Sequence, residues 1–310
     1  MTRRFARART DVSAFAFTAL TGLSAALILA LLAVILAYLA WLGGGQISWR
    51  FLVGGTDGDL FDATTAGIFP MLVGTAARVI LMTVFVIPVG VITALYLTEY
   101  ANPATLLTRV IRSAVNNLAG VPSIVFGLFG VGFFISFLGG GLDALAGNTA
   151  PRWGRPALLW ASLTLAVMTL PVVIVATEEA LKAIAPGLRE ASLALGATRL
   201  ETIRRIVLPN ALPGILTGGI LAISRAAGEV APILFTGAAY YLKDTPRSVT
   251  DQFMDLAYHV YVLSTQSPNV DQTRPILFGT VVVLLLLTFS LNLVAVLIRA
   301  RIRSSLRSAQ

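Results

Sequence analysis

Long apolar runs constrain this chain more than any other feature of its sequence. Stretches of about 20 apolar residues recur along it, which is the length that an α-helix needs to cross about 30 Å of hydrocarbon. Of the 310 residues, 56% are hydrophobic and only 12% are charged, whereas soluble domains carry about 25% charged residues. The mean hydropathy is +0.83. The sequence therefore predicts an all-α membrane protein built as one bundle.

Six apolar segments are predicted to cross the membrane: residues 15–42, 71–97, 117–138, 158–177, 212–235 and 276–298. The first follows a basic N-terminus, as a signal peptide would, but its apolar run exceeds the roughly 7–15 residues of a signal sequence. We expect a retained anchor. Residues 1–66 then form an N-terminal tail, this anchor and an outer loop, residues 67–300 hold the other five helices, and residues 301–310 form a basic tail.

Basic residues predict the orientation of the helices. Of the 23 lysines and arginines, six lie on one side of the predicted membrane: Arg50, Arg152, Arg155, Lys243, Arg247 and Arg274. Fifteen lie on the other side: Arg3, Arg4, Arg7, Arg9, Arg109, Arg112, Lys182, Arg189, Arg199, Arg204, Arg205, Arg299, Arg301, Arg303 and Arg307. The positive-inside rule predicts that the second side and both termini are cytoplasmic. The net charge of +8 is therefore attributed to membrane orientation, and no nucleic-acid partner is expected.

The sequence carries few residues suited to metal or enzyme chemistry. It has no cysteine and one histidine, His259, so we expect no disulfide, iron–sulfur cluster, metal site or cofactor. A P-loop needs a Gly-Lys pair, but leucine precedes both lysines, Lys182 and Lys243. No nucleophile–base pair is evident. We therefore expect no enzymatic activity, and any ATP hydrolysis would belong to another polypeptide.

A polar stretch, residues 186–209, separates the fourth and fifth predicted spans. It is predicted to form two short helices with a left-handed turn at Gly196. Thr198 and Glu201 have capping-box spacing, so the second helix should begin at Thr198 and end at Pro209. The first helix presents small residues beside Glu190. It is suited either to a cleft in another protein or to the membrane surface.

The order of residues in this stretch resembles the EAA loop of bacterial ABC-importer permeases. Glu190-Ala191-Ser192 is followed after three residues by Gly196 and after nine more by Ile206-Val207-Leu208-Pro209. Ser192 replaces the family's usual second alanine, and serine is small enough for the same cleft. The resemblance implies a six-helix, MetI-like type I importer bundle. It also implies a coupling helix on a separate ATPase, with contacts from Glu190, Ala191, Ser192, Gly196, Ile206, Leu208 and Pro209.

Two basic residues, Arg78 and Arg225, remain within predicted spans. Arg225 lies about 13 residues into the fifth span, near mid-membrane, and Glu229 follows on the same helix face. Intramembrane charge favours a functional role, and a guanidinium can bind phosphate oxygens bidentately. A self-satisfied structural ion pair is the alternative. Arg78 is expected either to extend to the interface or to line the outer mouth of an anion path.

A second resemblance covers parts of the third and fifth spans. Residues 224–237, SRAAGEVAPILFTG, and residues 118–129, LAGVPSIVFGLF, resemble phosphate-importer permeases of the PstA type. This resemblance implies phosphate import across a bacterial inner membrane. It also implies a second permease subunit, two ATPase copies and an extracytoplasmic phosphate-binding protein.

Several alternatives remain open. Another oxyanion importer, for sulfate or molybdate, would share the EAA loop, and the partner permease of the phosphate system shares the Arg/Glu spacing. A secondary transporter or channel would need only the intramembrane charges. Pro88, Pro122 and Pro171 are predicted to interrupt their spans, and His259 is expected in an interfacial aromatic belt.

Overall fold

The computed structural model describes residues 12–56 and 58–308. The basic residues Arg3, Arg4, Arg7 and Arg9 lie outside this part of the chain. The chain is helical, and its described residues form no β-strand beyond one isolated bridge. In order, the helices are α1 (Val12–Gly44), α2 (Trp49–Val53), α3 (Phe69–Leu95), η1 (Tyr96–Tyr100), α4 (Leu106–Leu118), α5 (Ser123–Phe129), η2 (Gly130–Gly139), α6 (Gly140–Ala146), α7 (Leu158–Lys182), α8 (Pro186–Ala194), α9 (Arg199–Thr202), η3 (Ile203–Val207), α10 (Leu208–Ala227), α11 (Ala231–Thr236), α12 (Leu256–Thr265) and α13 (Val270–Ser308), where η denotes a π-helical turn.

Six helical stretches within the described residues are long and apolar enough to cross a membrane, which confirms the predicted all-α, six-span architecture. They are Ala14–Gly44, Phe69–Tyr100, Ser123–Ala146, Leu158–Lys182, Arg199–Ala227 and Val270–Ile302. The helix α13 continues to Ser308, so residues 301–308 of the predicted basic tail are helical.

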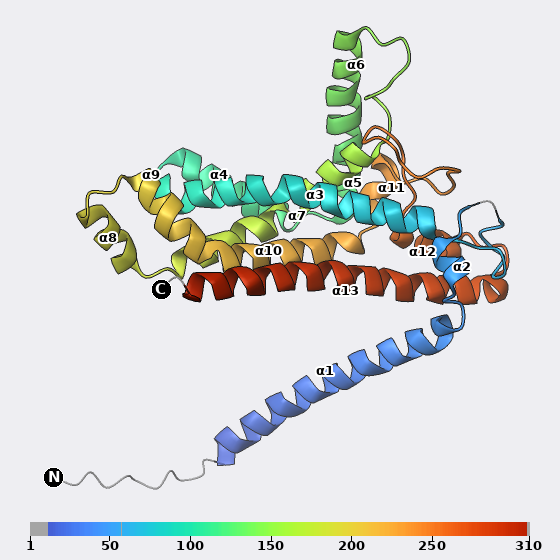
Figure 1. Ribbon diagram of the computed structural model, residues 1–310, viewed down its shortest axis with the longest axis horizontal. Coiled ribbons are helices and arrows are strands. Elements are labelled where there is room, and N and C mark those ends of the chain that lie inside the picture. The colour runs from blue at the N-terminus through green and yellow to red at the C-terminus, as the bar shows by residue number, and fades with distance from the viewer. Residues whose placement is uncertain (1–11, 57, 309–310) are drawn as a thin grey trace.

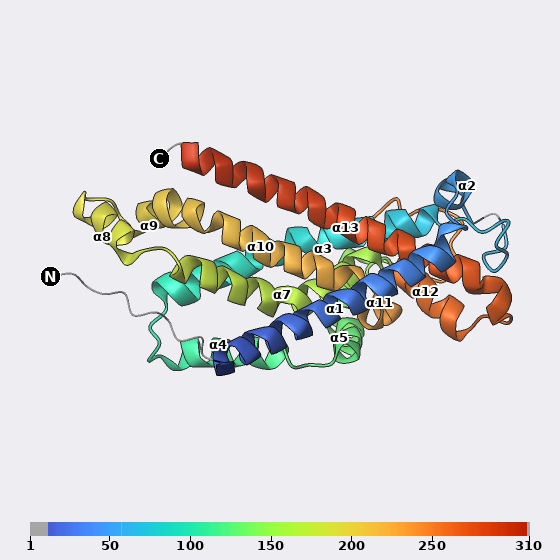
Figure 2. The ribbon, with the colours of Figure 1, turned by 90° about the horizontal axis from the view of Figure 1, so that it is seen from below.

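The bundle core lies between α3, α7 and α10, which run side by side with α13 (Figures 1 and 2). Buried Met82 of α3, Leu165 of α7 and Ala222 of α10 belong to one apolar cluster. A Cβ at Gly90 of α3 would lie 2.6 Å from Val173 Cγ1. The glycine therefore permits the close approach of α3 to α7.

Two spans leave this bundle. The helix α1 diverges from it, as Figure 1 shows, and Tyr38 packs edge-to-face on Phe278 of α13 near the end where the two meet. The continuous stretch α5–η2–α6 stands across the direction of the other helices (Figure 1). Both carry many exposed apolar side chains. They therefore present apolar surface to lipid or to other subunits.

The third span differs from its predicted limits of 117–138. Pro122 is the N-cap of α5, and the helical stretch runs from Ser123 to Ala146. Residues 106–118 instead form the separate helix α4, whose Thr105 cap accepts from Thr108 N–H.

Pro88 and Pro171 lie inside continuous helices. The predicted interruptions at these two prolines are therefore wrong.

The end of the bundle opposite the loop between α7 and α10 is closed by α2, α12 and the loop before α3 (Figure 1). Phe51 of α2, Leu60, Met71 of α3 and Leu256 of α12 share one buried cluster, so the predicted boundary at residue 66 runs through a packed core. His259 of α12 is 2% exposed. Its expected place in an interfacial belt is wrong, because its helix turns it into this end of the protein.

Candidate functional site

The loop between α7 and α10 has the local geometry that its sequence predicts. Gly196 has φ +84°, a left-handed conformation that costs other residues about 1–2 kcal/mol. Thr198 Oγ1 accepts from Glu201 N–H at 3.3 Å, and Glu201 Oε2 accepts from Thr198 N–H at 2.9 Å. This reciprocal capping box starts α9. The predicted pair of short helices and their turn are therefore present.

The first of these helices, α8, is presented outward. None of its residues is buried, Glu190 and Ala191 are exposed, and Leu195 just beyond it is 89% exposed. A hollow of about 500 Å³ lies between α8 and the following turns. Its lining includes Ala191, Ser192, Gly196, Glu201, Arg205 and Ile206. An exposed helix beside a hollow is a surface to which another protein can bind.

Pro209 does not end the second helix. The helical stretch continues from Arg199 to Ala227, and the π-turn η3 lies just before the proline. There Leu208 N–H donates to Ile203 O, five residues back, instead of to the carbonyl four residues back. The backbone hydrogen bonds have therefore already left the α-helical pattern at the point where the proline has no N–H to donate. Asn210 Nδ2 also donates to Ile206 O at 2.7 Å. The predicted stop is wrong, and the loop continues directly into α10.

Arg225 and Glu229 do not share one continuous helix. The helix α10 ends at Ala227, and the next helix, α11, begins only at Ala231. Arg225 Nε lies 3.8 Å from Glu229 Oε1, with side-chain exposures of 43% and 23%. This separation is longer than a hydrogen bond. The two charges therefore form a loose pair at a helix break, with the guanidinium partly open.

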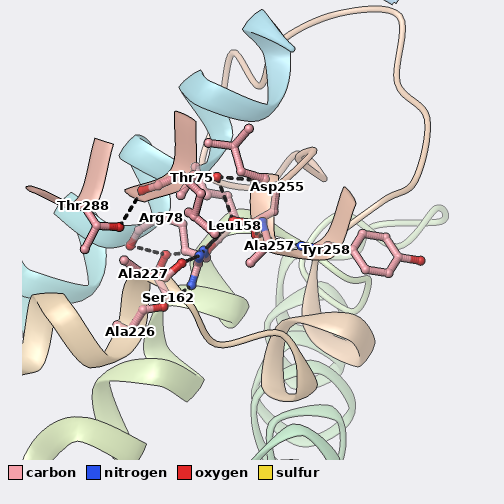
Figure 3. Close-up of polar contacts among 12 residues, drawn as sticks. Thr75, Arg78, Leu158, Ser162, Ala226, Ala227, Asp255, Ala257, Tyr258 and Thr288 are labelled. Atoms are coloured by element: carbon pink, nitrogen blue, oxygen red, sulfur yellow. Dashed lines mark hydrogen bonds and ion pairs between the residues drawn. The ribbon is translucent and has the colours of Figure 1, made fainter. Parts of the chain in front are cut away.

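Arg78 lies within the protein rather than at its surface. Its side chain and that of Asp255 are both 0% exposed, and Nη2 lies 2.8 Å from Asp255 Oδ2. Figure 3 shows the guanidinium between Asp255 and the end of α10. The prediction that Arg78 extends to the interface is wrong, because none of its side chain is exposed.

The remaining donors of Arg78 bind the last carbonyls of α10. Nη1 donates to Ala226 O at 2.9 Å, and Nη2 donates to Ala227 O at 3.3 Å. The final carbonyls of a helix lack helical partners and carry the negative end of its dipole, so a cation stabilises them. Arg78 therefore holds α10 at the point where the fifth span breaks.

Asp255 connects this arginine to α12. Its Oδ1 accepts from Ala257 N–H and Tyr258 N–H, which caps α12. Its Oδ2 accepts from Thr75 Oγ1 at 3.0 Å and from Arg78 Nε at 2.9 Å. We call Thr75, Arg78 and Asp255 the buried clamp. It joins α3, the end of α10 and the start of α12 (Figure 3).

Sequence reasoning did not identify Thr75 or Asp255 as part of this site. An arginine in an apolar span requires a counter-ion, and that requirement was the available signal. The counter-ion lies 177 residues away in the sequence, so no local spacing could have selected it among the acidic residues of the loops.

Comparisons with known proteins agree with this fold. The family model for "binding-protein-dependent transport system inner membrane component" matches residues 86–307. A probable ABC transporter permease protein of Bacillus subtilis, YqgI, is 31% identical over 90% of this chain and 92% of its own length. The Mycobacterium tuberculosis H37Rv protein named phosphate transport system permease protein PstA 1 is 34% identical over 78% and 72%.

Solved structures share the architecture at low sequence identity. A chain of a bacterial alginate ABC transporter has a TM-score of 0.64 and 16% identity, covering 91% of this chain and 92% of that chain. A chain of the MetNI methionine ABC transporter has a TM-score of 0.51 and 21% identity, covering 76% and 94%. The MetI-like fold and the resemblance to PstA-type permeases are thus confirmed. The chain is a multi-pass membrane protein that belongs to the family of binding-protein-dependent transport system inner membrane components.

Proposed function

We propose that this chain is the permease subunit of an ATP-driven importer that moves inorganic phosphate into the cytoplasm. The observation that carries the proposal is the loose, partly exposed pair of Arg225 and Glu229 at the break after α10. The name of the mycobacterial relative, a phosphate transport system permease protein, supports the choice of phosphate over sulfate or molybdate.

The chemistry of the proposal rests on the open side of Arg225. A guanidinium offers a planar fork of N–H donors that matches two oxygens of a phosphate. Since Glu229 stands at 3.8 Å, it can hold the side chain by charge without occupying its donors. Phosphate would bind to these donors in passing, while Glu229 limits how tightly the anion is held. The buried clamp would keep the end of α10 attached to α3 during this exchange.

The energy for import would come from ATP hydrolysis by a separate ATPase that binds the loop between α7 and α10. Glu190, Ala191, Ser192 and Gly196 would contact the ATPase, and Ile206, Leu208 and Pro209 would carry the motion into α10. The exposure of α8 and the hollow behind it support this role. Because the helix is continuous through Pro209, a displacement of the loop would reach Arg225 along a single helix.

The importer would also contain a second permease, two copies of the ATPase and an extracytoplasmic phosphate-binding protein. The stretch α5–η2–α6 supports a contact with a second permease. Its Phe129, Phe133 and Phe137 stack along one exposed face, with ring centroids 5.2 and 5.9 Å apart. Stacked aromatic faces of this kind are suited to packing against a neighbouring helix.

Both termini are proposed to lie in the cytoplasm of a bacterium, with the chain in its inner membrane. The start of α1, the loop carrying α8 and the end of α13 lie toward the same end of the molecule (Figures 1 and 2). The chain has no cysteine, so Leu195→Cys would supply a unique thiol on the loop. A membrane-impermeant maleimide should label it only after the membrane is opened, and labelling of intact cells would contradict this orientation.

The substrate assignment is tested with Arg225→Ala and Arg225→Lys in the assembled complex. Uptake of labelled phosphate should fall by at least tenfold in Arg225→Ala and by less in Arg225→Lys, because lysine keeps the charge and loses the fork. Arg274→Ala, at an exposed outer arginine, is the matched control. Wild-type uptake by Arg225→Ala would refute the anion path, and competition by sulfate or molybdate equal to that by phosphate would refute the substrate.

The coupling assignment is tested with Glu190→Ala and Gly196→Pro. Proline cannot adopt φ +84°, so Gly196→Pro should abolish copurification of the ATPase or uncouple ATP hydrolysis from uptake. Glu179→Gln, at an exposed glutamate near the end of α7, serves as the control for Glu190→Ala. Unchanged copurification and transport in both loop variants would refute the docking role.

A further inference from the structure

Residues 186–209, which we call the coupling loop, contact more of the protein than the helix that follows them. Because α8 has no buried residue, its position depends on a few specific contacts. Ser192 and Thr202 share a hydroxyl hydrogen bond of 2.9 Å, which ties α8 to the end of α9. The other anchors of the loop lead to a different span.

The first of these anchors is Arg189, the residue before Glu190. Its Nη2 donates to Glu99 Oε1 at 3.0 Å and to Leu181 O at 2.7 Å, and its Nη1 donates to Ile184 O at 2.9 Å. The side chains of Arg189 and Glu99 are only 21% and 10% exposed. Arg189 thus joins the end of α7, the start of the loop and η1.

The second anchor is Arg199, the first residue of α9. Its guanidinium carbon lies 5.0 Å from the centroid of the Tyr100 ring, within the range of a cation–π contact. Glu99 and Tyr100 are consecutive residues of η1, the turn that continues α3. Both short helices of this loop, α8 through Arg189 and α9 through Arg199, are therefore attached to the same turn of the same span.

We infer that Glu99 and Tyr100 are positioning residues that make α3 move with the coupling loop. This inference rests on the proposed function. The turn η1 is itself held in the bundle, since Leu97 is buried in one cluster with Leu181 of α7 and Val207 of η3. The helix α3 also carries Arg78, which holds the end of α10 beside Arg225 and Glu229.

A displacement of α8 would accordingly be transmitted to the intramembrane charges through two connections. The first is the continuous helix that leads from the loop through α10. The other runs through Arg189 and Arg199 to η1, along α3 and into the buried clamp. With both helices displaced together, the clamp would remain intact while the break after α10 changes position. If the contacts of Arg189 with Glu99 and of Arg199 with Tyr100 were removed, α10 would move while α3 stayed in place.

The test measures phosphate imported per ATP hydrolysed by the full complex in proteoliposomes, with labelled inorganic phosphate as the probe. Glu99→Gln keeps the shape and removes the charge, and Tyr100→Leu removes the ring. Tyr100→Leu should lower the ratio by about fivefold, the size expected for the loss of an exposed cation–π contact, and Glu99→Gln by about tenfold, the size expected for the loss of a hydrogen bond between charged groups. Tyr100→Phe keeps the ring, and Glu179→Gln removes an exposed charge at the same end. Both should stay within about twofold of wild type.

Copurification of the ATPase separates this inference from the proposed function. Glu99→Gln and Tyr100→Leu should retain the ATPase at wild-type levels, whereas Gly196→Pro tests the docking itself. A wild-type import ratio in Glu99→Gln and Tyr100→Leu would overturn the inference. So would loss of the ATPase from either variant, because the residues would then support docking rather than transmission.

A cross-link gives a second measurement that does not depend on losing an interaction. The chain has no cysteine, so Tyr100→Cys with Arg199→Cys places a unique pair across the second anchor. If the loop and η1 move as one unit, joining this pair with a short bis-maleimide should restore the import ratio of the unlinked double variant toward wild type. A cross-link that abolishes transport would overturn the inference, because the two segments would then move relative to each other.

Discussion

Replacing Arg78 with methionine is the sharpest test of the buried clamp. Methionine keeps much of the length and apolar volume of arginine and removes all of its donors. Asp255, which is 0% exposed, would lose its cation, Ala227 O would lose its Arg78 donor, and Ala226 O would keep only backbone donors such as Glu229 N–H. The break after α10 would then have no anchor on α3.

The magnitude follows from the geometry. Opposite charges 2.8 Å apart attract by about 6 kcal/mol at an effective dielectric constant of about 20, and the cost of removing both from water offsets part of this. Breaking a buried pair by removing one partner costs about 3–5 kcal/mol. Arg78→Met should therefore lower the free energy of unfolding by about that amount.

The assay is reversible unfolding in mixed detergent micelles, followed by far-UV circular dichroism. Arg274→Met is the matched control, because the Arg274–Asp271 pair is 3.9 Å long with side-chain exposures of 61% and 93%. Exposed pairs contribute about 0–1 kcal/mol. The double variant Arg78→Met with Asp255→Asn should lose less than the two single losses combined, since it leaves no unpaired charge. A loss in Arg78→Met no larger than that in Arg274→Met would show that the clamp does not stabilise the bundle.

Three further predictions concern other parts of the chain. Gly90→Val should destabilise the α3–α7 contact by about 1–3 kcal/mol, since a Cβ there would lie 2.6 Å from Val173; detergent unfolding measures this, with Gly132→Val as the control in open space. Burial lowers the pKa of His259 from 6.5 to about 4, so the unfolded chain binds a proton that the folded chain rejects, and stability should fall as the pH drops from about 6.5 toward 4. His259→Leu should flatten that pH dependence, and an unchanged profile would contradict the assignment. Asp143→Ala should lower the midpoint of thermal unfolding, because Asp143 accepts from the N–H groups of Arg152, Trp153 and Gly154; Asp244→Ala, at an exposed loop residue, is its control.

Local chemistry accounts for the parts of the site that were predicted correctly. The turn at Gly196 and the capping box of Thr198 and Glu201 involve residues at most three apart, so their spacing specifies them. Pro209 shows the limit of such reasoning. A proline ends a helix when the missing N–H would break a regular α-helical hydrogen bond. The π-turn before Pro209 had already replaced the α-helical hydrogen bonds at this point, so the helix continues.

The sequence by itself determined that the chain has six membrane-spanning segments and a polar loop of two short helices between the fourth and fifth of them, because apolar length and short-range capping are local properties. Only the tertiary structure decided where the charges act. It buried Arg78 against Asp255, broke the fifth span after Ala227, and joined Arg189 and Arg199 to η1. These contacts depend on how helices distant in the sequence pack, and in an apolar bundle each buried charge is stabilised by whichever counter-ion that packing brings near it.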